Sequence, residues 1–101
     1  MAPPAVLITG AAKRIGAVLA RRFAAAGWHV VIHAGHSPVL ARDLAQTLPS
    51  AEVVEADLLD RAAALAMIDE LAARLPDWRM LINSAAVFKP DTAQGIDPII
   101  F

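Results

Sequence analysis

Two glycines and a basic pair lie between an apolar run and a helical pattern near the start of the chain. In the stretch VLITGAAKRIGAVLA, Gly10 and Gly16 stand on either side of Lys13 and Arg14. Glycine lets a backbone turn sharply and brings bare N–H groups close to a ligand, and a helix N-terminus adds about half a positive charge. The two basic side chains strengthen the same field. These residue types at this spacing predict a seat for a phosphate group.

Spacing excludes two common phosphate-binding loops. A Walker-type loop needs a second glycine five residues after the first, followed by Lys-Ser/Thr, and Ile15 stands at that glycine position. The GxGxxG pattern also fails, because Ala12 and Ile15 occupy its second and third glycine positions. A glycine pair by itself is also typical of a plain bend between a strand and a helix in an α/β fragment without a ligand. The surrounding residues have to distinguish a phosphate site from such a plain bend.

Basic and acidic residues are unevenly divided along the chain, although the net charge is only −1. Residues 1–42 contain five basic residues and no acidic one, and all ten acidic residues lie at Asp43 or later. A positive field around the first turn follows. Such a field favours a small anionic ligand over a long nucleic acid.

Composition limits the class of protein. With 101 residues, 57% of them hydrophobic, the chain has room for one domain at most. It has no cysteine, which excludes a disulfide framework and a thiolate metal site, and we assign no metal ligand. No apolar run approaches the roughly 18 residues that span a bilayer, and the start of the chain lacks the features of a signal peptide. We therefore expect a cytoplasmic protein without a membrane partner.

Four β-type runs alternate with three helical ones, which is typical of a parallel sheet with helices on its faces. The expected strands cover residues 5–9, 29–33, 52–56 and 80–83. Right-handed crossovers then predict the strand order 3-2-1-4. The expected fold class is α/β, a Rossmann-type doubly wound parallel sheet, in which ligands bind beyond the carboxyl ends of the strands.

Each helical run has an apolar stripe and a terminal signal. The expected stripes are Ile15, Leu19 and Phe23 in the first helix, Leu40, Leu44 and Leu48 in the second, and Leu65, Ile68, Leu71 and Leu75 in the third. Gly27 is expected to end the first helix, Ser37-Pro38 to begin the second, and Asp60 to cap the third.

The end of the second strand favours one dinucleotide over another. A site for NAD usually has an acidic residue about 20 residues after the glycines, where it binds a ribose hydroxyl, and VVIHAGHSP contains none. It contains His33, His36 and Ser37 instead. Imidazoles and a hydroxyl facing a basic turn suit the extra phosphate of NADP, although they are also typical of an ordinary exposed stretch after a strand. With the acid-free first 42 residues, they favour NADP.

Further polar residues follow the third and fourth strands. Asp57 is placed either to accept a hydrogen bond from an adenine amino group or to be a plain turn residue. Asn83 and Ser84 precede small residues that would let a flat ring lie against the backbone, and Asn83 is equally suited to tie two strands together. Phe88 either walls a ring-binding pocket or caps the core.

The end of the chain indicates an incomplete domain. Asp97-Pro98 has the form of a helix start, and the apolar strand at residues 80–83 would be left at the edge of the sheet. A self-sufficient domain usually avoids such features. We therefore expect residues 1–101 to be the N-terminal cofactor-binding half of a single Rossmann-type domain, incomplete without the C-terminal half.

In order and spacing, TGAAKRIG, VVIHAGHS, ADL and NSAAVF resemble the motifs of the short-chain dehydrogenase/reductase family, and most closely its pteridine reductase-like branch. The resemblance implies NADP(H) as cofactor, hydride transfer to a carbonyl or ring C=N bond of a small molecule such as a pterin, and a homo-oligomer, commonly a tetramer. The family's proton donor is a tyrosine, assisted by a lysine and a serine, and the chain contains no tyrosine. We expect these catalytic residues beyond Phe101 and assign none within the chain.

The resemblance also implies roles for particular residues. It implies contacts to the cofactor for Gly10, Lys13, Arg14, Ile15, Gly16, His33, His36, Ser37, Asp57, Leu58, Asn83 and Ala85, and contacts to the substrate for Arg14 and Phe88. The first five would lie at the phosphates and nicotinamide, the next three at the ribose phosphate, the following two at adenine and the last two at the adjoining ribose. Ser84 and Ala86 depart from the Asn and Ser of the pteridine reductase-like pattern.

Two functions from different classes fit these observations. The first is an NADPH-dependent oxidoreductase of which the chain is the N-terminal part. The second is a non-catalytic NADP-binding sensor or interaction module, since the chain has a phosphate seat without acid–base residues. A Tyr-x-x-x-Lys sequence after residue 101 would support the enzyme.

Overall fold

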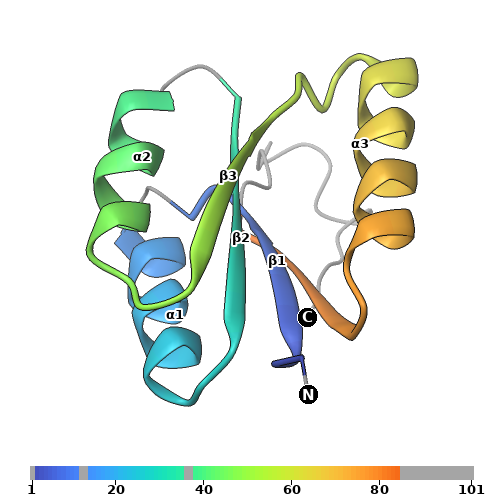
Figure 1. Cartoon of the computed structure of the whole chain (residues 1–101). Coiled ribbons are helices and arrows are strands. Elements are labelled where there is room, and N and C mark those ends of the chain that lie inside the picture. The colour runs from blue at the N-terminus through green and yellow to red at the C-terminus, as the bar shows by residue number, and fades with distance from the viewer. Residues whose placement is uncertain (1, 12–13, 36–37, 85–101) are drawn as a thin grey trace, which may run out of the picture.

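The computed structural model describes residues 2–11, 14–35 and 38–84, and it has the expected alternation of strands and helices (Figure 1). In chain order the elements are β1 (Ala5–Thr9), α1 (Arg14–Ala25), β2 (His29–Ala34), α2 (Pro38–Gln46), β3 (Ala51–Glu55), α3 (Arg61–Arg74) and β4 (Trp78–Asn83). Each predicted strand is confirmed to within two residues at either end. The helix expected at Asp97-Pro98 lies outside the described residues.

The four strands form one parallel sheet in the order β3-β2-β1-β4, which confirms the predicted 3-2-1-4 order and the Rossmann-like α/β fold. Leu7 of β1 is in register with Val31 of β2 on one side and with Leu81 of β4 on the other. Helices α1 and α2 cover one face of the sheet, and α3 covers the other (Figure 1). All carboxyl ends of the strands therefore meet at the same edge.

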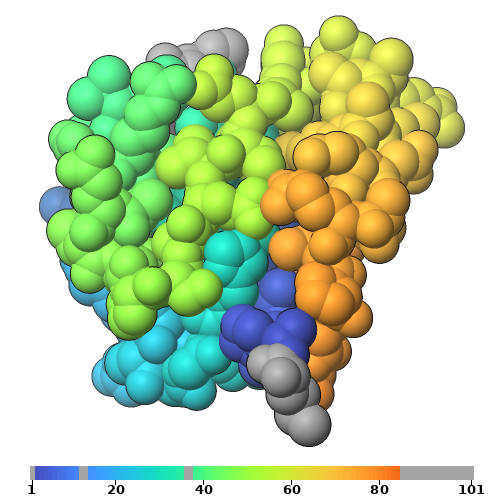
Figure 2. Space-filling model, in the orientation of Figure 1, coloured from blue at the N-terminus to red at the C-terminus, as the bar shows by residue number. Residues whose placement is uncertain are grey.

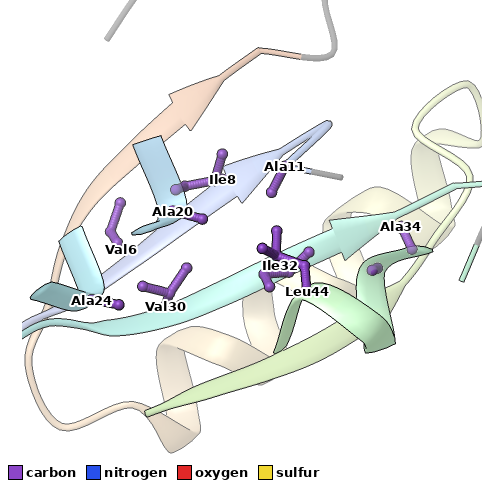
Figure 3. Close-up of a cluster of buried hydrophobic side chains, with 10 residues drawn as sticks. Val6, Ile8, Ala11, Ala20, Ala24, Val30, Ile32, Ala34 and Leu44 are labelled. Carbon is purple, nitrogen blue, oxygen red and sulfur yellow. The ribbon is translucent and has the colours of Figure 1, made fainter. Parts of the chain in front are cut away.

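Two apolar clusters hold the layers together. The cluster under α1 and α2 takes Val6, Ile8, Val30 and Ile32 from the strands and Ala20, Ala24 and Leu44 from the helices (Figure 3). The cluster under α3 consists of Leu7, Val31, Met67 and Leu71. Successive strand residues point to opposite faces, so a strand covered on both sides needs apolar residues without interruption. This is why all of AVLIT is buried.

The buried line of α1 differs from the predicted stripe. Gly16, Ala20 and Ala24 are buried, whereas Ile15 is 72% exposed, so the prediction for Ile15 was wrong. Leu19 and Phe23 are half-buried and pack against the edge of the cluster. Residues without a long side chain let the helix backbone approach the sheet closely, and the larger side chains lie beside that contact line.

The stripes of the other two helices need similar corrections. In α2, Ala41 and Leu44 are buried and Leu40 is 57% exposed. In α3, Met67 and Leu71 are buried and Leu65 is 52% exposed. Leu65 precedes Met67 by two residues, which on a helix of about 3.6 residues per turn places the two on nearly opposite sides.

The helix ends agree with the sequence signals. Gly27 has a φ of 93°, and the N–H of Trp28 donates to the Phe23 carbonyl at 3.0 Å, which is the hydrogen-bond pattern of a glycine-terminated helix. The rings of Phe23 and Trp28 pack edge to face at 5.1 Å. Asp60 caps α3 by accepting from the Ala63 N–H at 3.1 Å. Pro38 is the first residue of α2, as predicted.

Among residues 2–11, 14–35 and 38–84, no helix has both the length and the apolar character that crossing a bilayer requires.

Candidate functional site

The carboxyl ends of β1 and β4 lie side by side and are tied together by polar groups. Thr9 is in register with Asn83, and its hydroxyl donates to the Asn83 side-chain carbonyl at 2.8 Å. The backbone N–H of Ser84 donates to the Thr9 carbonyl at 3.1 Å, and the Ser84 hydroxyl donates to the same oxygen. Asn83 therefore has the strand-tying contact that was one of its two predicted roles.

The turn after β1 brings the start of α1 onto the end of that strand. Gly10 has a φ of 71°, a left-handed conformation that glycine adopts without strain. A Cβ atom on Gly16 would overlap the Gly10 carbonyl oxygen and would lie 2.6 Å from the Ala11 Cα and 2.8 Å from the Ser84 Oγ. No side chain fits at position 16. The close approach leaves the N-terminal turn of α1 at the end of β1, where backbone N–H groups and the helix dipole favour an anion.

The charge around this turn is positive in the structure as well as in the sequence. Arg14, the first residue of α1, is exposed, and the helix contains no acidic residue; Arg21 and Arg22 are exposed as well but lie in the second half of the helix, away from this turn. Among the described residues, none of the salt bridges involves α1. The guanidinium groups of this helix are therefore not neutralised by carboxylates of the described chain.

At the end of β2, the structure describes one of the two predicted histidines. His33 is only 5% exposed, and its Nε2 lies 2.6 Å from the Ala56 carbonyl oxygen. Its Nδ1 is buried and has no hydrogen-bond partner within the described part of the chain. The contact of His33 with the ribose phosphate stays a prediction.

At the end of β3, Asp57 organises the turn that leads to α3. Its Oδ1 accepts from the Leu59 N–H at 2.9 Å, and its backbone carbonyl accepts from the Asp60 N–H at 2.9 Å. The carboxylate is exposed, and Leu58 beside it is 39% exposed. The turn role of Asp57 is therefore present in the structure, and its contact with adenine stays a prediction.

The structure brings the predicted site residues together in two groups. Gly10, Gly16 and Asn83 lie where β1, α1 and β4 meet, and His33 lies beside the turn that contains Asp57 and Leu58. Arg14 and Ile15 are exposed on the first turn of α1. The predicted residues that fall outside the described ranges are Lys13, His36, Ser37, Ala85 and Phe88.

Sequence reasoning missed two contributors to this region. Thr9 was predicted only as the last residue of the first strand, and Ala56 only as the last residue of the third strand. A threonine that ends one strand and an asparagine that ends another would have been a usable signal, because neighbouring parallel strands bring their last residues together. No comparable signal exists for Ala56, which takes part through its backbone.

The opposite end of the sheet has a different polar cluster, which we call the amino-end network: His29, Ser50, Glu52, Glu70 and Arg74. The imidazole contacts the Ser50 hydroxyl at 2.8 Å and the Glu52 carboxylate at 2.7 Å. Arg74 donates to both oxygens of Glu52, at 3.0 and 2.7 Å, and to Glu70 at 3.0 Å. The hydrogen bond from Arg74 lowers the pKa of Glu52, burial of the carboxylate opposes this shift, and the hydrogen bond to His29 supports it.

A groove of about 680 Å³ runs between β3 and α3. Its lining includes Val54, Ala56 and Met67, and also Glu52, Glu70 and Arg74 of the amino-end network. Figure 2 shows β3 at the front of the molecule between α2 and α3. Of the residues predicted to bind a cofactor or substrate, none of those that the structure describes lines this groove.

The sheet order and the helix that closes on β1 at Gly16 define a Rossmann-like α/β fold with a tight glycine turn between β1 and α1. The family model described as short chain dehydrogenase matches residues 4–98. The chain belongs to this family of oxidoreductases, whose members bind a nicotinamide cofactor.

Similar proteins of known class support this assignment. Sulfoacetaldehyde reductase 2 of Chromohalobacter salexigens is 35% identical over 96 residues, which cover 91% of this chain and 38% of that protein. The structure of FolM alternative dihydrofolate reductase 1 from Brucella suis in complex with NADP aligns with a TM-score of 0.73 and 30% identity, over 87% of this chain and 36% of that one.

The structure of a β-ketoacyl-[ACP] reductase (FabG) from Bacteroides thetaiotaomicron aligns with a TM-score of 0.78 and 25% identity, over 91% of this chain and 46% of that one. The chain thus spans less than half the length of each of these relatives.

Proposed function

We propose that the protein is an NADPH-dependent reductase and that residues 1–101 are its N-terminal cofactor-binding half. The observation that carries the proposal is the contact at Gly16, where the absence of a side chain brings the start of α1 onto the end of β1. The turn at Gly10 and the exposed Arg14 at the start of α1 suit the negative charge of a dinucleotide pyrophosphate. The described residues therefore fit the phosphate part of such a cofactor.

The preference for NADP rests on charge. Between β2 and α2 the chain contains no carboxylate that would repel a ribose phosphate, and His36 and Ser37 would hold that phosphate. The FolM structure that this chain resembles contains NADP. Asp57 and Leu58 would face the adenine, and Asn83 and Ala85 the ribose next to it.

When bound, the nicotinamide supplies a hydride to a carbonyl or ring C=N carbon of the substrate. Gly10, Gly16 and Lys13 would hold the cofactor phosphates, and Ile15 would lie against the nicotinamide side. Arg14 and Phe88 would orient a small cyclic substrate. A tyrosine beyond residue 101, with its lysine and serine, would donate the proton that completes the reduction.

A pterin is the substrate that the pteridine reductase-like motifs favour, and the alignment with FolM is consistent with it. Ser84 and Ala86 differ from that pattern, so the proposal covers other small cyclic acceptors as well. We further propose that the protein is cytoplasmic and that it forms a homo-oligomer. The family resemblance implies that this oligomer is a tetramer.

The test of the function uses the whole protein. NADPH oxidation is followed by absorbance with a panel of pterin, quinonoid and cyclic carbonyl acceptors, and NADPH and NADH binding are compared by calorimetry. We expect turnover with at least one acceptor and tighter binding of NADPH than of NADH. Tight NADPH binding without turnover of any acceptor would contradict the enzyme and favour the second candidate.

That second candidate is a non-catalytic NADP-binding sensor or interaction module. The observation that favours it is the lack of any tyrosine in the 101 residues, which leaves a phosphate seat without a proton donor of the family type. A Tyr-x-x-x-Lys sequence later in the whole protein supports the reductase, and its absence supports the sensor.

A further inference from the structure

The N–H and the carbonyl of Ala56 both hydrogen-bond to residues at the end of β2. The Ala56 N–H donates to the Ala34 carbonyl at 3.3 Å, and the Ala56 carbonyl accepts from the Nε2–H of His33 at 2.6 Å. The first contact continues the ladder between β2 and β3, whereas the second is made by a side chain. His33 thus fixes the chain at the residue where β3 has ended and the turn begins.

The tautomer of His33 follows from this contact. A carbonyl oxygen only accepts, so the hydrogen must lie on Nε2, and Nδ1 is an acceptor in the neutral ring. Nδ1 is buried from solvent and has no partner within the described part of the chain. A phosphate would need a hydrogen on the nitrogen that it contacts. In the neutral ring Nδ1 has no hydrogen to donate, and because this atom is buried, the described geometry does not present His33 as a phosphate ligand.

The turn after Ala56 is ordered by a short series of hydrogen bonds. The Asp57 side chain accepts from the Leu59 N–H, and the Asp57 carbonyl accepts from the N–H of Asp60, which in turn caps α3. The direction of Asp57 and Leu58 thus depends on the preceding Ala56 peptide as well as on α3. A change at the Ala56 carbonyl is expected to alter how both residues face the site.

We infer that His33 is a positioning residue: it holds the Ala56 carbonyl so that Asp57 and Leu58 face the adenine, and it does not bind the ribose phosphate itself. The inference rests on the proposed function and on the adenine contact within it. Because NADPH and NADH carry the same adenine, loss of His33 weakens the binding of both dinucleotides by the same factor. Loss of a phosphate ligand would weaken NADPH alone.

The experiment compares three variants of the whole protein by calorimetry with NADPH and NADH. His33→Leu removes the donor to Ala56, and we expect the dissociation constants of both dinucleotides to rise about tenfold. In steady-state kinetics we expect the KM for NADPH to rise and kcat to stay unchanged. His33→Gln places an amide N–H near the position of Nε2, and we expect it to restore both affinities to within about threefold of the wild type. His33→Asn reaches only the position of Nδ1 and is expected to behave like His33→Leu.

His29→Gln is the matched control, since it changes the other described histidine of β2 at the opposite end of the sheet and should leave both affinities unchanged. Weaker binding of NADPH with unchanged NADH binding in His33→Gln and His33→Asn would overturn the inference and make His33 a phosphate ligand. Wild-type affinities in all three His33 variants would overturn it too. If His33→Leu does not fold, the contrast between Gln and Asn decides the question.

A failure of the proposed function is distinguishable from these outcomes, because it shows in the wild-type protein itself, which would then bind neither dinucleotide or reduce no acceptor, whereas the inference on His33 is decided by the affinities of the variants relative to the wild type.

Discussion

The two ends of the sheet differ in how their polar groups are satisfied. In the amino-end network, His29 and Arg74 both hydrogen-bond to the Glu52 carboxylate, so the charges are compensated within the chain. At the carboxyl end, the side-chain hydrogen bonds of Thr9 and Ser84 join strands, and Arg14 at the start of α1 is exposed and has no salt bridge among the described residues. An end with compensated charges stabilises the fold, whereas a helix N-terminus beside an exposed arginine is suited to bind an anion.

The largest expected effect comes from filling the space at Gly16. A valine there would overlap Gly10 and Ala11, so we expect Gly16→Val to weaken NADPH binding by at least about a hundredfold and to lower the free energy of unfolding by about 2 kcal/mol. Calorimetry and urea unfolding of the whole protein measure the two effects.

Gly27→Ala is the matched control for that substitution. Gly27 has a positive φ but no atom within 4 Å of an added Cβ, so the alanine is expected to cost about 1 kcal/mol of stability and no NADPH affinity. Equal NADPH affinities of the Gly16 and Gly27 variants would contradict the role of the Gly16 contact.

The amino-end network is expected to affect stability alone. Glu52→Gln removes the charge that pairs with Arg74 and His29, and because Glu52 is partly exposed we expect a loss of about 1 kcal/mol in the free energy of unfolding. NADPH affinity should not change. A several-fold loss of affinity in Glu52→Gln would show that the two ends are coupled and would end the contrast between them.

Two serines allow a closer comparison of the ends. Ser84→Ala removes a hydrogen bond to the Thr9 carbonyl next to the phosphate turn, and Ser50→Ala removes one to His29. Each is expected to lower the free energy of unfolding by about 1 kcal/mol, and only Ser84→Ala to weaken NADPH binding, by about fivefold. Thermal melting and calorimetry on both variants test this, and equal affinities would place Ser84 outside the site.

The smallest expected effect is a pH dependence of the amino-end network. The pKa of Glu52 in the folded protein lies below its ordinary value of 4.5, chiefly because of the hydrogen bond from Arg74. The stabilisation is therefore complete above pH 4.5 and is lost as the pH falls through the lowered pKa. Melting curves from pH 7 downward should show the advantage of the wild type over Glu52→Gln shrinking below pH 4.5. A constant difference would exclude this linkage.

Much of the fold was predictable because its signals are local. The apolar run of β1, the glycine that ends α1 and the aspartate that caps α3 act over a few residues, and each was placed correctly. The tight turn between β1 and α1 was also predictable, because Gly10 and Gly16 allow a sharp bend and a close approach of the backbones, and its use as a phosphate site stays a prediction. The face of each helix was less predictable, since Ile15 and Leu40 are exposed while small neighbours are buried.

The sequence alone was sufficient for the order of strands and helices along the chain and for the glycine turn between β1 and α1, since these depend on residue type and short spacing; that this turn holds a phosphate stays a prediction. The contacts of His33 with Ala56 and of His29 with Glu52 depend on the tertiary structure, because each pair is separated by 23 positions and meets through the parallel pairing of β2 with β3. The register of two strands follows from packing on both faces of the sheet, and no short stretch of sequence contains that information.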